Sequence, residues 1–150
     1  MPPTTSKRLQ THVSIATSDL HRSRAFYRAL FDAEPALEKP DYVRFWPEEL
    51  GLVVGLNLHA APETRTGPLQ HLGLLYAEAG QLAQTRRRLE AAGFATRGSE
   101  HVECCYAELD QFWATDPSGV EWELFLAHAA VVEPKQESSA TAFCAPTCCS

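Results

Sequence analysis

Two histidines have the residue type and placement of metal ligands. His12 and His71 each begin or lie within a segment in which apolar and polar residues alternate, and they are 71 − 12 = 59 positions apart. Alternation with a period of two is typical of a half-buried strand. On each predicted strand the imidazole shares its face with a small neighbour, Ser14 or Gly73, which leaves room for an ion.

A late apolar segment adds carboxylates to this pair. Glu121 and Glu123 lie on one predicted face of residues 120–126, whose other face is apolar. Buried carboxylates are rare unless they are paired or bind metal. Glu121 lies nearer the start of the strand, where solvent alone can hydrate its carboxylate. Two imidazoles and one carboxylate form the facial set of non-haem Fe(II), with open positions for dioxygen and substrate.

The five cysteines form two clusters rather than spaced pairs. Cys104 and Cys105 are adjacent, so a disulfide between them would be strained, and two thiolates aimed outward suit a thiophilic centre such as trivalent arsenic or Cd(II). The alternative is a purely structural role, in which both cysteines are small buried apolar residues. Cys144, Cys148 and Cys149 near the end are expected to capture the metalloid and deliver it to Cys104 and Cys105, or to be inert.

The elements that must position these residues repeat along the chain. A strand, a helix and two or three strands are followed by a linker at 60–68, and the same order then begins again. The first half predicts a strand at 9–16, a helix that begins after Ser18 or Asp19 and ends before Pro35, and strands at 42–46 and 52–58. The second half predicts a strand at 71–76, a helix at 79–92 ended by Gly93, and strands at 94–97, 111–115 and 120–126.

Both halves therefore read β-α-β-β-β, which predicts an α+β fold. We expect one domain over residues 1–131, with modules at about 9–60 and 69–127 paired into a curved mixed sheet around a metal site. The two modules can pair within one chain, or each can pair with the other module of a second chain, and both arrangements build the same cup. A homodimer is therefore possible. Residues 132–150 are too polar to pack and predict a flexible tail.

Composition and charge argue against nucleic-acid binding and against a membrane span. The formal charge of −6 repels phosphate backbones, which argues against nucleic acid. No apolar run approaches the ~20 residues of a membrane span. The start of the chain has no apolar stretch typical of a secretory signal, so we expect a cytoplasmic protein.

Three motifs resemble the vicinal oxygen chelate (glyoxalase/dioxygenase) superfamily over residues 9–127. They are His12-Val-Ser-Ile-Ala-Thr-Ser-Asp-Leu, His71-Leu-Gly and Asp116-Pro-Ser-Gly-Val-Glu-Trp-Glu. The resemblance implies metal ligands on the first strand of each module and on the last strand, here His12, His71 and Glu123. A fourth, acidic ligand of the glyoxalase I type would lie in 52–58, which contains no acid. This favours a three-ligand oxygenase-like centre, with Asn57 or water able to complete the shell.

The Cys104-Cys-Tyr-Ala stretch before the last strand is similar to the ArsI/CadI branch of that superfamily. The resemblance implies an Fe(II)-dependent dioxygenase that cleaves the carbon–arsenic bond of trivalent organoarsenicals such as methylarsenite and releases arsenite. Cys104 and Cys105 would hold the arsenic. Two alternatives stay open: a CadI-like thiol protein that binds cadmium or arsenite without catalysis, and another superfamily enzyme, such as an extradiol-type dioxygenase or a thiol transferase.

Overall fold

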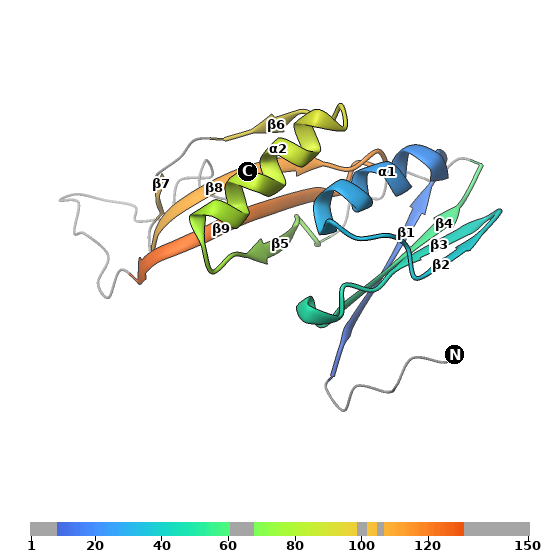
Figure 1. The fold of residues 1–150 in the computed structure, drawn as a ribbon, viewed down its shortest axis with the longest axis horizontal. Helices are drawn as coiled ribbons and strands as arrows, with labels where there is room; N and C mark the ends of the chain where they lie inside the picture. Colours follow the sequence, from blue (N-terminus) through green and yellow to red (C-terminus); the bar gives the residue numbers. More distant parts are fainter. Residues whose placement is uncertain (1–8, 61–67, 99–101, 105–106, 131–150) are drawn as a thin grey trace.

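The first module forms a four-stranded mixed sheet with one helix. The computed structural model describes residues 9–60, 68–98, 102–104 and 107–130. The strand order is β1-β4-β3-β2, with β1 parallel to β4 and the other pairs antiparallel (Figure 1). Its elements are β1 (Thr11–Thr17), α1 (Leu20–Phe31), β2 (Leu37–Lys39), β3 (Tyr42–Phe45), a 3-10 turn (Glu48–Leu50) and β4 (Leu52–Leu58).

The second module repeats this plan with one more strand. Its sheet has the order β5-β9-β8-β6, with β5 parallel to β9, and β7 pairs with β8 beside this path. The elements are β5 (Leu72–Leu75), α2 (Ala79–Ala91), β6 (Thr96–Arg97), β7 (Val102–Cys104), β8 (Ala107–Thr115) and β9 (Glu121–Ala130).

The α+β class and the two helices are confirmed, with one correction to the second module. Each module forms a mixed sheet of its own, and β7 is a strand that the five-element pattern lacks. It pairs with the start of β8, which begins at Ala107 rather than at the expected Gln111. The strand expected at 94–97 is shortened to Thr96–Arg97 because Phe94 turns into the core, where it is 6% exposed.

Capping explains where α1 begins and ends. The Asp19 Oδ1 atom accepts a hydrogen bond of 2.9 Å from the Arg22 backbone N–H, which satisfies one of the unpaired donors of the first turn. At the other end Asp32 adopts a left-handed conformation with φ of 51° and ends the helix. The second helix stops before Gly93, whose φ of +85° suits glycine.

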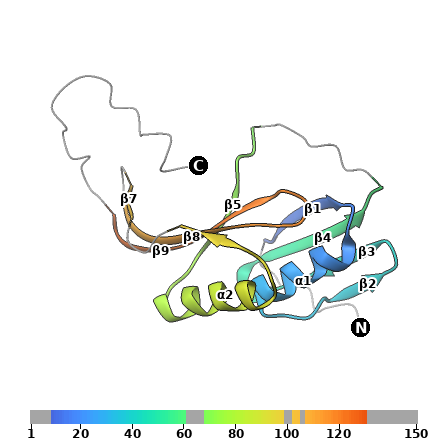
Figure 2. The same cartoon turned by 90° about the horizontal axis from the view of Figure 1, so that it is seen from above.

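Both helices lie on one side of the two sheets, and Figure 2 shows them next to each other there. The core fills the space between helices and strands, and among the described residues no helix lies over the opposite face of either sheet. The largest fully buried side chains are Trp122, Tyr27, Phe26, Phe45, Leu30, Leu56, Leu89 and Leu124. Within the described residues, no helix is long and apolar enough to cross a membrane.

A buried hydrogen-bond network ties the helix of the first module to the last turn of the second. The Tyr27 hydroxyl donates to Asp116 Oδ2 at 2.8 Å and accepts from the Trp122 indole N–H at 3.2 Å. Asp116 also accepts from the backbone N–H groups of Ser118 and Val120, both at 2.8 Å. Burial raises the pKa of Asp116 above its ordinary value, and these hydrogen bonds offset part of that effect.

Replacing the Tyr27 hydroxyl should therefore destabilise the fold out of proportion to its size. Tyr27→Phe leaves the Trp122 N–H without its acceptor in the core, and we expect the free energy of unfolding to fall by about 1–3 kcal/mol. Urea denaturation followed by circular dichroism measures it. Tyr42→Phe, which removes a hydroxyl outside this network, should cost about 0.5 kcal/mol or less. Equal losses in the two variants would contradict the assigned role of the network.

Candidate metal centre

The structure brings His71 and Glu123 together on neighbouring strands of the second sheet. Parallel pairing of β5 with β9 places Gly73 opposite Glu123, and His71 lies two residues before Gly73, directly ahead of β5. The His71 Nε2 atom is 3.3 Å from Glu123 Oε2. The side chains are 26% and 14% exposed, so the pair is half-buried yet reachable from solvent.

This geometry fits a divalent metal. Ligand nitrogen and oxygen atoms lie about 2.1 Å from such an ion, so two ligands at a right angle are about 3 Å apart. Burial raises the pKa of the Glu123 carboxyl above its ordinary value, and the nearby His71 counteracts part of this increase. A bound cation would favour the ionised carboxylate in the same way, only more strongly. The donor set, one imidazole and one carboxylate, suits Fe(II) among other first-row metals.

Trp113 supports the His71 imidazole. It lies opposite Glu123 in the β8–β9 register, and its indole meets the His71 ring nearly at a right angle, with ring centroids 4.9 Å apart. The Arg97 guanidinium covers the same indole at 5.3 Å from its centroid. Trp113 is therefore only 5% exposed although it lies on the helix-free face of the sheet.

Glu121 has different neighbours from Glu123. It accepts hydrogen bonds from the Arg97 guanidinium and from the Thr115 hydroxyl, both at 2.6 Å. The side chain is 31% exposed, as expected for a carboxylate at the start of the strand. The two glutamates thus share a face of β9, but only Glu123 is adjacent to a histidine ligand candidate.

The third predicted ligand lies apart from this pair. His12 is exposed on β1, on the face opposite Ile15 and Thr17, which pack into the core. Among the residues that the structure describes, no three His, Cys, Asp or Glu side chains gather closely enough to hold an ion. Within one chain, therefore, His71 and Glu123 are neighbours, whereas His12 lies on the other module.

The space expected beside each histidine has other occupants. A Cβ atom added to Gly73 would lie 3.3 Å from the Phe125 ring and 3.6 Å from the Glu123 carbonyl oxygen, so the missing side chain makes room for Phe125. Ser14 accepts a hydrogen bond of 2.9 Å from the Asn57 amide. The small neighbours therefore also serve packing and pairing within each sheet, and the room for an ion beside each imidazole stays a prediction.

The predicted thiol ligands are not located. The backbone of Cys104 ends β7, but its side chain lies outside the described residues, as do Cys105 and the three tail cysteines, Cys144, Cys148 and Cys149. Their proposed roles stay predictions. The residues that sequence reasoning missed are Arg97 and the contact of Trp113 with His71, since both depend on the register of β6, β8 and β9.

Comparison with known proteins decides the family. The model of the glyoxalase/bleomycin resistance protein/dioxygenase superfamily matches residues 9–124. The chain belongs to this superfamily. The solved structures agree in fold: a superfamily member from Alicyclobacillus acidocaldarius has a TM-score of 0.62 at 17% identity, covering 84% of this chain and 96% of that one. A domain from Frankia sp. has 0.61 at 22% identity, covering 82% and 100%.

Several superfamily relatives are closer in sequence. The trivalent organoarsenical cleaving enzyme of Bacillus sp. strain MD1 is 35% identical, over 92% of this chain and 81% of the relative. The protein of the same name from Thermomonospora curvata is 31% identical, over 93% and 99%. The cadmium-induced protein CadI of Mycobacterium tuberculosis is 34% identical, over 77% and 74%. The resemblance to this branch is confirmed.

Removal of Trp113 tests its support of His71. Trp113→Ala leaves a cavity beside the imidazole, and we expect the free energy of unfolding to fall by about 3–5 kcal/mol and the His71 ring-proton resonances to shift. Denaturation and histidine-selective NMR measure the two effects. Leu75→Ala is the matched control, because Leu75 is 66% exposed on β5 and its truncation should change neither. An unmoved His71 resonance in folded Trp113→Ala would refute the contact.

Proposed function

We propose that this protein is an Fe(II)-dependent dioxygenase that cleaves the carbon–arsenic bond of trivalent organoarsenicals, such as methylarsenite, and releases arsenite. The observation that carries the proposal is the 3.3 Å approach of His71 and Glu123 in a chain whose relatives include trivalent organoarsenical cleaving enzymes. The pair has the ligand types of a mononuclear iron site, and it lies on the open face of the second sheet.

Each residue has a distinct task in this proposal. His71 and Glu123 would hold the iron from one sheet, and Trp113 would keep the imidazole in its orientation. Iron bound there would supply redox chemistry with dioxygen. Cys104 and Cys105, as thiolates, would bind the trivalent arsenic and orient its carbon bond toward the iron, so that proximity provides much of the rate acceleration. The Cys144, Cys148 and Cys149 cluster would deliver the metalloid.

The third ligand would come from a second copy of the chain. His12 lies on the face of β1 that points away from the core, and Glu123, beside His71, lies on the corresponding face of β9. In a twofold homodimer the first sheet of one copy can face the second sheet of the other, which would complete two equal sites. This arrangement accounts for an exposed imidazole on β1 that belongs to no cluster of three potential metal ligands in the described part of its own chain.

A second candidate function is binding without catalysis. The similarity to the cadmium-induced protein CadI favours it, because adjacent thiols bind soft ions whether or not iron is present. The two functions differ in their dependence on iron and dioxygen. A third reading, an oxygenase or thiol transferase that acts on a carbon substrate, would not depend on Cys104 and Cys105.

Dioxygen should be required for turnover. Iron-loaded protein incubated with methylarsenite in air should release arsenite, measured by chromatography with elemental mass detection, and the same mixture without oxygen should release none. Zn(II)-loaded protein in air is the matched control, because zinc has no redox chemistry. Release of arsenite without oxygen, or from the zinc form, would contradict the dioxygenase; binding without release in air would favour sequestration.

Mixing two inactive variants tests the shared site. His12→Ala and Glu123→Gln should each be inactive, yet their heterodimer retains one intact site. Random re-association should therefore restore about a quarter of the wild-type activity. Mixing His71→Ala with Glu123→Gln is the control, because both ligands come from the same copy and no intact site forms. An inactive first mixture of folded, dimeric variants would show that the site is not shared.

A further inference from the structure

Arg44 carries a positive charge on the face of the first sheet that points away from the core. Its neighbours in β3, Val43 and Phe45, are buried in the core, so alternation turns Arg44 to the opposite face. Strand β4 lies between β3 and β1, and its two registers align Arg44 with Ser14, two residues after His12. Arg44 thus shares a sheet face with the predicted metal ligand of the first module.

Two donors on this face have no acceptor among the described residues. The Arg44 Nε atom and the indole Nε1 atom of Trp46, two residues further along the chain, are both buried without a hydrogen-bond partner. Glu38 is the only acidic residue in the four strands of this sheet, and it pairs with Arg24 of α1 on the other face. Buried donors without an acceptor are rare in native structures, so their position indicates where an acceptor oxygen binds.

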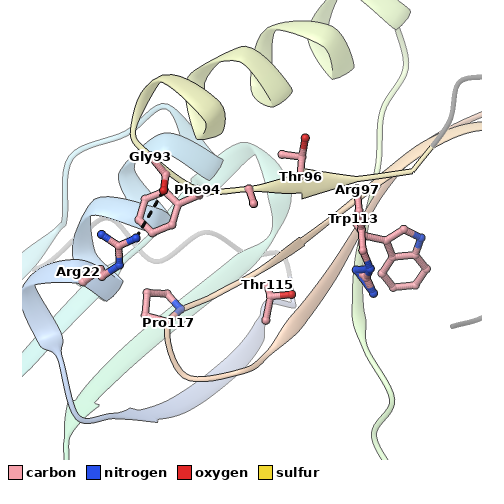
Figure 3. A pocket seen from close by; sticks show the side chains of 9 residues that line it. Arg22, Gly93, Phe94, Thr96, Arg97, Trp113, Thr115 and Pro117 are labelled. Atoms are coloured by element: carbon pink, nitrogen blue, oxygen red, sulfur yellow. Dashed lines mark hydrogen bonds between the residues drawn. The ribbon is translucent and has the colours of Figure 1, made fainter.

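The arginines around the second sheet already have partners within the chain. A pocket of about 390 Å³ at the outer edge of this sheet has Arg97 at one end and Arg22 at the other (Figure 3). Arg97 binds Glu121 and covers the Trp113 ring at 5.3 Å from its centroid. Arg22 donates to the Gly93 carbonyl at 3.5 Å. Both guanidinium groups are therefore engaged, in contrast to the one on the first sheet.

Aromatic residues stand on either side of Arg44 along its strand. Tyr42 precedes it by two residues and Trp46 follows it by two, and both side chains are half-buried. A Cβ atom added to Gly55, which lies opposite Arg44 on β4, would be 2.9 Å from the Tyr42 hydroxyl oxygen and 3.1 Å from a carbon of its ring. The Tyr42 ring therefore lies over the β4 backbone beside the cation. A flat organic group can contact such a ring while its substituent meets the guanidinium.

The separation of His12 from Arg44 matches an aromatic organic group. Neighbouring strands are about 4.8 Å apart and a strand rises about 3.3 Å per residue, so two strands and two residues place the two Cα atoms about 12 Å apart. A methyl group on arsenic held beside His12 is too short to reach the cation. A phenyl ring with a substituent opposite the arsenic extends most of the way.

We propose that Arg44 selects organoarsenicals whose organic group is an aromatic ring with an anionic substituent opposite the arsenic, such as 4-carboxyphenylarsenite. The carboxylate would accept hydrogen bonds from the Arg44 guanidinium and the Trp46 indole, after a change of rotamer that turns both donors toward it. The formal charge of −6 repels an anionic substituent elsewhere, so Arg44 decides the sign of the preference. The inference rests on the proposed function for the position of the arsenic beside His12.

Binding of two matched arsenicals to the full-length, metal-free protein tests the preference. Phenylarsenite and 4-carboxyphenylarsenite present the same arsenic to the cysteines, so the ratio of their dissociation constants in calorimetric titration isolates the substituent. Wild-type protein should bind the carboxylate form about tenfold more tightly, as expected for a charge-assisted hydrogen bond. Arg44→Gln should abolish or reverse this preference, and Arg44→Lys, which keeps the charge, should retain part of it.

Arg87→Gln is the matched control, because Arg87 also has no partner among the described residues but is exposed on α2, and this variant should keep the tenfold preference. An equal preference in Arg44→Gln and wild type would overturn the inference, as would equal binding of the two arsenicals by wild type.

Arsenite release from phenylarsenite by the iron-loaded protein in air separates this inference from the proposed function. Release without any binding preference would overturn the inference alone. A preference that Arg44→Gln removes, without arsenite release, would support the selectivity and contradict the dioxygenase. Failure of both arsenicals to bind would overturn both.

Discussion

The parallel pairing of β5 with β9 is the constraint on which the candidate site depends. It places Gly73 opposite Glu123, so that a histidine just before the first strand of the module meets a glutamate near the start of the last one. A shift of one residue would turn Glu123 toward the core and Trp122 toward solvent. Burial of Trp122 and Leu124 in the core, where Trp122 packs against Tyr27 and Phe31 of α1, opposes that shift, because their apolar surface is removed from water. The core thus fixes the register that the site needs.

Contacts between the modules hold both helices on the same side of the two sheets. Tyr27 of α1 binds Asp116 and Trp122 of the second module, and Arg88 of α2 donates to the Ala29 carbonyl of α1 at 3.0 Å. Both described helices are held on the same side, so in the described part of the chain no helix lies over the other face of either sheet (Figure 2). An arrangement that packs the helices together in this way cannot also fold the two sheets of one chain over each other. In the proposed homodimer, His12 and Glu123 of one chain would therefore belong to different sites.

Sequence patterns predicted the elements and the candidate ligands, and they failed where long-range register decides. Alternation around His12 and His71 located two strands because half-buried strands have a period of two, and the Asp19 cap located α1. The same alternation could not tell that Phe125 fills the space beside Gly73, since that contact joins β9 to β5 across the sheet. Nor could it find the stacking of Arg97 on Trp113, which depends on the two-residue pairing of β6 with β8.

Glu121 and Glu123 share one face of β9 but have different neighbours and therefore different chemistry. Both side chains point away from the core, two residues apart on β9. Near the surface, the Arg97 guanidinium neutralises the Glu121 carboxylate, and the Thr115 hydroxyl donates a hydrogen bond to it. Glu123 has His71 as its neighbour and is more buried, so its pKa is raised and a cation would relieve the cost of its charge. Arg97 is engaged by Glu121 and forms no described ion pair with Glu123, so the Glu123 carboxylate is left beside the His71 imidazole.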